Sequence, residues 1–367
     1  MTTFTPVAVP AEVAPPKPEE NPLAPKLGLL KNGWWQPGAN LQFWAFGANQ
    51  GGDTQTTARI RRLELKLKGE LIPKLIGFNV MIDPARALDN NKSTLTTSDG
   101  ATVSVNNQGA VSIVGDVVLT VMSEYADVSV GQFKIPVSYE GAGSAAKLLF
   151  PERAVVSRAY GDIRDIGLKI EKKLGKHFYY QAAVFNGEGQ NKLDTNKQKD
   201  IAGRIEVYPL DGMTVGLVGY AGITHRDSSL TKDRLEADFK LDLAHLLVQA
   251  EYIHGWDGAT GQTTAPGQTT ARREGHGVYG VVGYTFFDKL QPLFRVGYYD
   301  PDLSQDLPGK AGERTNLTVS DEVTTFELGL NYYLLADNAK LQAAWSRFHY
   351  ENEPDRGEFI LSAQASF

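Results

Sequence analysis

The chain has no cysteine among its 367 residues. It also has no stretch that approaches the roughly 18 consecutive apolar residues of a transmembrane helix. The absence of cysteine excludes disulfides, thiolate zinc sites and a cysteine nucleophile. The absence of a long apolar run does not exclude a β-barrel, which crosses a membrane with strands of roughly 10 residues that are apolar on one face only.

Basic residues are in the minority, since 37 Lys and Arg stand against 43 Asp and Glu and give a net charge of -6. A nucleic-acid-binding protein normally carries a basic patch, so this composition argues against a nucleic-acid partner. It does not exclude an anion channel. Selectivity there depends on the local field at the narrowest point, and charges on distant loops are screened from it.

Catalytic and metal-binding arrangements are also lacking in the sequence. The six histidines are scattered among expected turns, loops and strand ends, and no pair has metal-ligand spacing on one face. No convergent Ser, His and carboxylate triad can be localised. We therefore predict no catalytic residues, no metal ligands and no cofactor, in a protein that is not an enzyme.

The N-terminal segment is rich in proline, glutamate and lysine. Residues 1–26 read MTTFTPVAVPAEVAPPKPEENPLAPK, without the basic and then apolar regions of a signal peptide. We predict a disordered periplasmic arm over residues 1–34, in a chain whose export signal is already missing, and a transmembrane β-barrel over residues 35–367.

From residue 39 onward, segments of about 10 residues alternate apolar and polar side chains. In the segment 232–243, one face is apolar and includes Leu235 and Phe239, whereas the opposite face carries five charges. Five charges are not buried in a protein core without partners, so that face must contact water. Sixteen such segments are predicted as strands, near 39–48, 57–68, 73–83, 115–125, 127–136, 161–172, 177–187, 199–209, 213–223, 232–243, 246–256, 276–287, 290–300, 322–334, 339–350 and 357–367.

The connections between these strands are sorted by length. Short links, such as 173–176 and 244–245, alternate strictly with long ones, such as 84–114 and 137–160. This sorting is typical of antiparallel strands that cross a membrane with tight periplasmic turns and large outer loops. The sequence therefore predicts an all-β fold, a sixteen-stranded antiparallel transmembrane β-barrel of the bacterial outer membrane.

Two features of the strand ends support a barrel. The last strand alternates apolar residues on one face up to the terminal Phe367, and it resembles the signal by which outer-membrane barrels are recognised for assembly. Aromatic residues near strand ends fit the interfacial girdles of such barrels: Trp34, Trp35, Tyr298, Tyr299, Tyr332, Tyr333, Phe348 and Tyr350.

The segment 128–171 departs from the regular rhythm. Its flanks alternate as two short strands, but its middle is small, glycine-rich and charged, unlike a core helix. We predict that the flanks belong to the wall and that the middle, the third outer loop, folds inward as the constriction of a pore.

Three local patterns resemble the phosphate-selective porin O/P family of bacterial outer membranes. They are RIRRL at 59–63, VGQFKIP at 130–136 followed by Ser138, and Glu152-Arg153 leading to RDIG at 164–167. With the strand rhythm, the similarity covers residues from about 35 to 367. The stretch from GQFKIP to RDIG is its most specific part.

The resemblance implies a homotrimer of barrels whose third outer loop forms an eyelet of Arg and Lys, and which passes phosphate, polyphosphate or other anions. Arg offers phosphate a planar fork, Lys a compact charge and Ser a neutral hydrogen bond, and moderate sites let an ion enter and leave. Carried over by position, the eyelet candidates are Lys134, Ser138 and Arg153, with Arg62, Arg59 and Arg61 supplying positive charge beside them.

Alternation raises a question about two of these candidates. Unbroken alternation along 127–136 would turn Lys134 toward lipid, so a bulge or the exit into the loop must turn it inward. Arg61 shares parity with Leu63, which leaves Arg62 as the pore-facing member of its trio. For Lys134 and Arg153 the alternative role is a salt bridge that pins the loop to the wall, with Glu152 or Glu140.

The ninth strand, at 213–223, carries no basic residue where phosphate-specific members have part of an arginine ladder. The resulting prediction is an outer-membrane porin for passive diffusion of small solutes through a water-filled pore, anion-selective through its basic eyelet. Its expected partners are inorganic anions or small solutes, outer-membrane lipid and lipopolysaccharide. The alternatives are a general or organic-solute porin with weak ion selectivity, and a barrel that anchors an envelope complex.

Overall fold

The structure is a computed structural model that describes residues 26–29, 32–87, 93–96, 102–105, 113–223, 231–258, 272–301, 303, 322–351 and 354–367. The predicted arm thus lies mostly outside the described residues. Near the C-terminal end of this arm, strand β1 (Leu27–Leu29) pairs antiparallel with the start of strand β2 (Gly33–Gln50). Strand β2 begins two residues before the expected boundary at residue 35.

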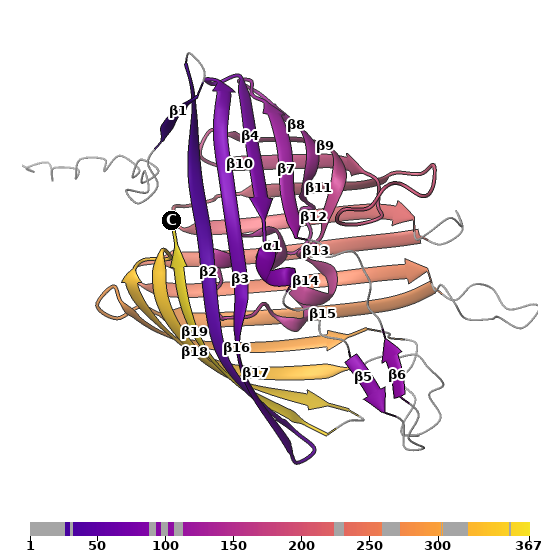
Figure 1. Ribbon diagram of the computed structural model, residues 1–367, viewed down its shortest axis with the longest axis vertical. Coiled ribbons are helices and arrows are strands. Elements are labelled where there is room, and N and C mark those ends of the chain that lie inside the picture. Colours follow the sequence, from indigo (N-terminus) through magenta and orange to yellow (C-terminus); the bar gives the residue numbers. More distant parts are fainter. Residues whose placement is uncertain are drawn as a thin grey trace, which may run out of the picture.

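Within the described residues, sixteen antiparallel strands form one closed barrel (Figure 1). The last strand, β19, pairs with β2 through eleven residue pairs, so the sheet has no free edge at its seam. Closure pairs the N–H and C=O groups that hydrocarbon would leave unsatisfied. All sixteen predicted segments overlap a wall strand, which confirms the predicted fold class. The wall consists of β2, β3 (Asp53–Ile72), β4 (Ile76–Ile82), β7 (Val114–Val121), β8 (Asp127–Lys134), β9 (Arg164–Leu174), β10 (Phe178–Phe185), β11 (Asp200–Val207), β12 (Met213–Ile223), β13 (Thr231–Leu243), β14 (Leu246–Gly258), β15 (Arg272–Tyr284), β16 (Leu290–Asp300), β17 (Val323–Leu335), β18 (Ala339–Tyr350) and β19 (Arg356–Ser366).

The two faces of the wall have opposite chemistry. On β13, Leu235 is 55% exposed on the outside, whereas the neighbouring Glu236 and Asp238 point inward and are buried. This arrangement is the reverse of a soluble protein and matches strands with lipid outside and polar groups inside. None of the described helices is long and apolar enough to cross a membrane.

On one side of the barrel, which we assign to the periplasm, every connection between wall strands is a tight turn of two to five residues. On the outer side, β2 and β3 are joined by a turn of only two residues, Gly51 and Gly52, with φ of 60° and 94°. The expected strict alternation of short and long links does not hold at this position. The reason is that β2 and β3, with 18 and 20 residues, extend outward as one long hairpin. Two glycines supply the positive φ angles that close such a hairpin.

The segment 135–163, between β8 and β9, forms the inward loop, which contains the helices α1 (Tyr139–Ala142), η2 (Ala145–Lys147) and α2 (Val155–Tyr160). Its apolar side chains, such as Phe150 and Val156, are buried in one cluster with wall residues that include Leu293. Its carbonyl oxygens accept hydrogen bonds from lumen-facing side chains of four strands: Gln42 to Ala145, Asn331 to Leu149, Lys340 to Leu148 and Gln364 to Ala146. The loop therefore lies inside the barrel (Figure 1).

Three described elements between β4 and β7 are not part of the barrel wall. Strands β5 (Ser93–Thr96) and β6 (Thr102–Val105) form a separate two-stranded sheet. The short helix η1 (Pro84–Ala87) follows β4.

Candidate pore constriction

Strand β8 delivers Lys134 into the barrel. The register between β8 and β9 is continuous over eight pairs, so no bulge turns the side chain. The strand ends at Lys134, where the chain enters the inward loop. The ammonium group donates to the carbonyl oxygens of Gly141 and Gly143, at 2.8 and 2.7 Å. The exit into the loop, the second of the two expected routes, therefore explains why Lys134 points inward.

A β-bulge changes which side chains of β3 face the lumen. Gln42 of β2 pairs with Arg62, but the next residue, Phe43, pairs with Ile60. Arg61 is therefore an extra residue in β3 with no partner on β2. Beyond this point the alternation of β3 is shifted by one residue.

The bulge adds Arg59 and Arg61 to the lumen beside Arg62, which faces it by the regular alternation. The guanidinium groups of Arg59 and Arg61 lie over the ring of Trp44, at 4.8 and 5.2 Å from its centre. Arg62 donates to the Gln42 side chain at 2.6 Å. Arg61 thus lies inside the barrel, although its parity with Leu63 had placed it on the lipid side.

Asp162 of the inward loop binds three cations from the loop and the wall. Its carboxylate oxygens lie 3.0 Å from Lys134, 3.1 Å from Arg153 and 3.7 Å from Arg164. Burial alone would raise the pKa of Asp162, but these three positive charges outweigh burial and lower the pKa to about 2. Asp162 is therefore ionised throughout the neutral range.

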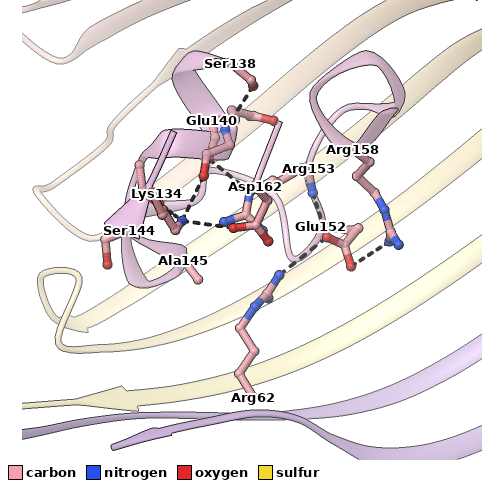
Figure 2. Close-up of polar contacts among 12 residues, drawn as sticks. Arg62, Lys134, Ser138, Glu140, Ser144, Ala145, Glu152, Arg153, Arg158 and Asp162 are labelled. Atoms are coloured by element: carbon pink, nitrogen blue, oxygen red, sulfur yellow. Dashed lines mark hydrogen bonds and ion pairs between the residues drawn. The ribbon is translucent and has the colours of Figure 1, made fainter. Parts of the chain in front are cut away.

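Glu152 of the inward loop also binds three cations, at a second position. Its carboxylate lies 2.8 Å from Arg61, 3.4 Å from Arg62 and 3.1 Å from Arg158. Figure 2 shows Arg62 reaching from the wall toward Glu152, with Arg158 approaching from the loop. Burial would raise the pKa of Glu152, but the charges of Arg62, Arg61 and Arg158 hold that pKa well below its usual range.

These contacts define a constriction cluster with a positive balance. Six cations surround Glu152 and Asp162, and Arg164 has one further carboxylate partner, Asp116, at 2.7 Å. Six positive and three negative charges leave an excess of three positive charges. The cluster consists of Arg61, Arg62, Lys134, Arg153, Arg158 and Arg164 with Asp116, Glu152 and Asp162.

Two of the expected eyelet residues are anchors in this geometry. The side chains of Arg62 and Arg153 are only 5% and 3% exposed. Arg153 donates to the backbone oxygen of Glu140 at 3.0 Å, and Arg62 reaches Glu152. Arg62 of β3 thus links the wall to Glu152 of the loop, whereas the contacts of Arg153 with Glu140 and Asp162 lie within the loop and hold its two ends together.

Ser138 is not brought together with the constriction cluster. Its side chain is fully buried, and its hydroxyl accepts a hydrogen bond from the Gly141 N–H at 2.9 Å as the N-cap of α1. Its backbone N–H donates to Glu236 of β13 at 2.6 Å. Ser138 therefore fixes the start of the loop against the opposite wall.

Sequence reasoning missed the most exposed cation of the cluster. Arg158, on α2, has a side chain that is 56% exposed, against 18% for Lys134. Arg164 was part of the RDIG pattern but was not singled out as a site residue. The available signal was the density of charge in 152–165, which holds three arginines beside three acidic residues.

The rest of the lumen is more neutral. Strand β12, the ninth of the wall, carries no basic residue. On its neighbours, Arg204 is matched by Glu206 at 2.6 Å and by Asp238 at 2.9 Å. Among the described residues, no group of three or more His, Asp or Glu is arranged to hold a metal ion.

We expect the contacts of Asp162 with Lys134, Arg153 and Arg164 to be lost only in strong acid. The folded pKa of Asp162, about 2, lies below the unfolded value of about 3.9, so its stabilising effect is complete above about 3.9 and is lost as pH falls through about 2. The wild-type channel should show a rise in single-channel current noise below about pH 4. In Asp162→Asn the noise should be high at neutral pH already and should lack this acid step, and a variant that keeps the acid step would contradict this assignment.

The chain matches the family described as phosphate-selective porin O and P over residues 39–232, which is more than half of its length. No curated protein matches it in sequence. Solved structures with a similar fold include the anion-selective porin from Comamonas acidovorans, with a TM-score of 0.60 at 10% identity over 91% of this chain and 100% of that one. The outer-membrane channel DcaP of Acinetobacter baumannii has a TM-score of 0.61 at 12% identity over 91% and 97%.

A third similar structure is OmpT of Vibrio cholerae in a trimer form, with a TM-score of 0.55 at 11% identity over 91% of this chain and 99% of that one. At these identities the structures establish the fold, and the family match establishes the class of protein. The chain therefore belongs to the phosphate-selective porin O and P family and is a porin of the bacterial outer membrane.

Proposed function

We propose that this porin is anion-selective and that the constriction cluster sets its preference. The observation that carries the proposal is the excess of three positive charges where the inward loop meets β3, β8 and β9. Charges at a constriction act at short range and with little screening, so they outweigh the net negative charge of the whole chain. A structurally similar porin is described as anion-selective, which agrees with this proposal.

A general porin with weak ion selectivity is the second candidate. It is favoured by a recess of about 640 Å³ on the periplasmic side of the loop, which we call the inner recess. Its charges are mixed: Lys134, Lys147, Lys169, Arg204 and Lys240 with Asp116, Glu140, Glu171 and Glu206. Such a lining attracts ions of both signs, so the constriction alone would have to supply the preference.

Reversal potentials in a KCl gradient test the proposal, and they should indicate anion preference in the wild type. Because Arg158 is the most exposed cation of the cluster, Arg158→Gln should lower the chloride-to-potassium permeability ratio roughly twofold, since its charge acts partly through water. Arg347→Gln is the matched control, because Arg347 lies on the outer face of β18 and pairs with Asp355.

Cation preference in the wild type would overturn the proposal. Absence of any conductance would instead support the third reading, a barrel that anchors an envelope complex.

Preference for phosphate is a separate part of the proposal. If phosphate binds at the constriction, millimolar or lower phosphate should block the chloride current. Lys134→Gln should weaken this block about tenfold, the effect of removing one charge-assisted hydrogen bond. Lys240→Gln, in the inner recess, is the control. No block at all would leave the general-porin reading.

We also propose that the protein forms a homotrimer. The subunits would contact one another through the side of the barrel where the strands are short, which we call the low side. Strands β7, β8, β10 and β11 have eight residues each, against 13 in β13, β14, β15 and β17. Eight tilted residues give a wall about 20 Å tall, less than the apolar band of about 25 Å that lipid requires. Contact with neighbouring subunits would cover this side, while the taller strands face lipid and lipopolysaccharide.

A bulky residue on the low side should therefore break the trimer. Val130 is 54% exposed on β8, and Val130→Trp should shift the protein from trimer to monomer in light scattering of detergent-solubilised samples. Val282→Trp, at an exposed position on the tall strand β15, should leave the trimer intact. Equal behaviour of the two variants would count against this interface.

A further inference from the structure

The outer half of the lumen contains a second recess, which we call the outer recess. It has a volume of about 670 Å³ and lies between the second half of the inward loop and six adjacent wall strands, β16, β17, β18, β19, β2 and β3. Its lining combines two kinds of side chain, the aromatic residues Trp44, Phe46, Phe150, Phe348 and Tyr350 and the basic residues Arg59, Arg153, Arg158, Arg295 and Arg356.

The register of the wall places rings and guanidinium groups side by side. Trp44 of β2 pairs directly with Arg59 of β3, and Phe348 of β18 pairs with Arg356 of β19. Directly opposed side chains on one face of a sheet lie about 4.5–5.5 Å apart at Cβ. The two pairs flank the seam at which β19 closes on β2, so the recess has an aromatic and cationic wall on both sides.

The rings differ in how much surface they leave open. Trp44 is only 3% exposed and carries the guanidinium groups of Arg59 and Arg61, so it serves to hold these arginines. Phe348 and Tyr350 are half-buried, and their rings are stacked with centres 6.5 Å apart at an interplanar angle of 15°. Both residues line the recess and leave part of their surface open to it.

The charge of the recess favours an anion. Its five arginines face three carboxylates, those of Glu152, Glu327 and Glu358, which leaves an excess of two positive charges. Arg295 and Arg356 are paired with Glu327 and Glu358, each at 2.6 Å, whereas the exposed Arg158 shares Glu152 with other cations.

The unpaired groups of the lining point to the same sign of ligand. The buried polar atoms that have no hydrogen-bond partner among the described residues lining this recess are all N–H donors, on Trp44, Arg295 and Arg356. No buried acceptor of this lining is left without a donor, so the lining offers no spare oxygen that would favour a cation.

We propose that the outer recess binds organic anions that carry a planar ring, such as aromatic carboxylates, before they reach the constriction. The carboxylate would pair with Arg158, and the ring would pack against Phe348 and Tyr350. This inference rests on the proposed anion selectivity and adds the class of solute. Inorganic phosphate has no ring and gains only the electrostatic part of the attraction.

A matched pair of blockers tests the ring specificity in single-channel recordings of the full-length porin. Benzoate and cyclohexanecarboxylate have the same charge and similar size, but only benzoate has a flat aromatic face. Benzoate should block the chloride current at a concentration about two- to tenfold lower, the range that ring stacking and cation–π contacts supply. Equal blocking concentrations in a channel with anion preference would overturn the inference and leave the proposed function intact.

Two variants locate the effect. Phe348→Leu should bring the ratio of the two blocking concentrations close to one without changing the reversal potential, because leucine keeps most of the volume and removes the ring. Arg158→Gln should weaken both blockers by a similar factor and preserve the ratio. Phe326→Leu, at an exposed position on the outer face of β17, is the control and should behave as the wild type.

The same recordings separate the two proposals. Cation preference in the wild type would refute the proposed function, whatever the ratio. A ratio that survives in Phe348→Leu would show that the ring binds elsewhere and would overturn the outer recess as the site.

Discussion

The closed backbone ladder is the constraint on which the rest of the structure depends. In hydrocarbon an unpaired strand edge would leave N–H and C=O groups without partners, so the seam between β19 and β2 must close. Closure forces one face of every strand toward lipid and the other into a shared lumen. The lumen can then hold residues such as Glu236 and Arg295, which are almost inaccessible from outside but pair with polar groups around the interior.

Within that lumen, two carboxylates make a dense group of cations possible. Unscreened cations repel one another, and five guanidinium groups and one ammonium group do not remain near one loop without compensation. Glu152 and Asp162 each contact three cations and bind the inward loop to the wall in doing so. Because each carboxylate is shared, compensation is incomplete. The ion pairs that hold the loop therefore also leave the positive field, and anchoring and lining are two effects of one network.

The sequence predicts the parts of this fold that repeat locally. Alternation with a period of two identifies all sixteen wall strands, since lipid and water impose it on each strand separately. Alternation could not predict where the Lys134 side chain lies or what Ser138 and Arg158 contact. They depend on where an irregular loop meets distant strands, as when Ser138 binds Glu236, which is 98 residues away. The added residue at Arg61 does leave a mark on the apolar pattern, because Ile60 and Leu63 are three residues apart where the alternation elsewhere in β3 has a step of two.

That added residue links the two sites of the outer lumen. Side chains alternate with a period of two, so without the bulge at Arg61 the outer half of β3 would present its opposite face. Arg59 would then point to lipid and lose its place beside Trp44, and Ile60 would take its position in the lumen. The bulge itself adds Arg61, which binds Glu152 at 2.8 Å. One backbone irregularity thus supplies a guanidinium group to the outer recess and another to the constriction cluster, so an anion leaving the aromatic surface meets a continuous line of positive charge on its way to the narrowest point.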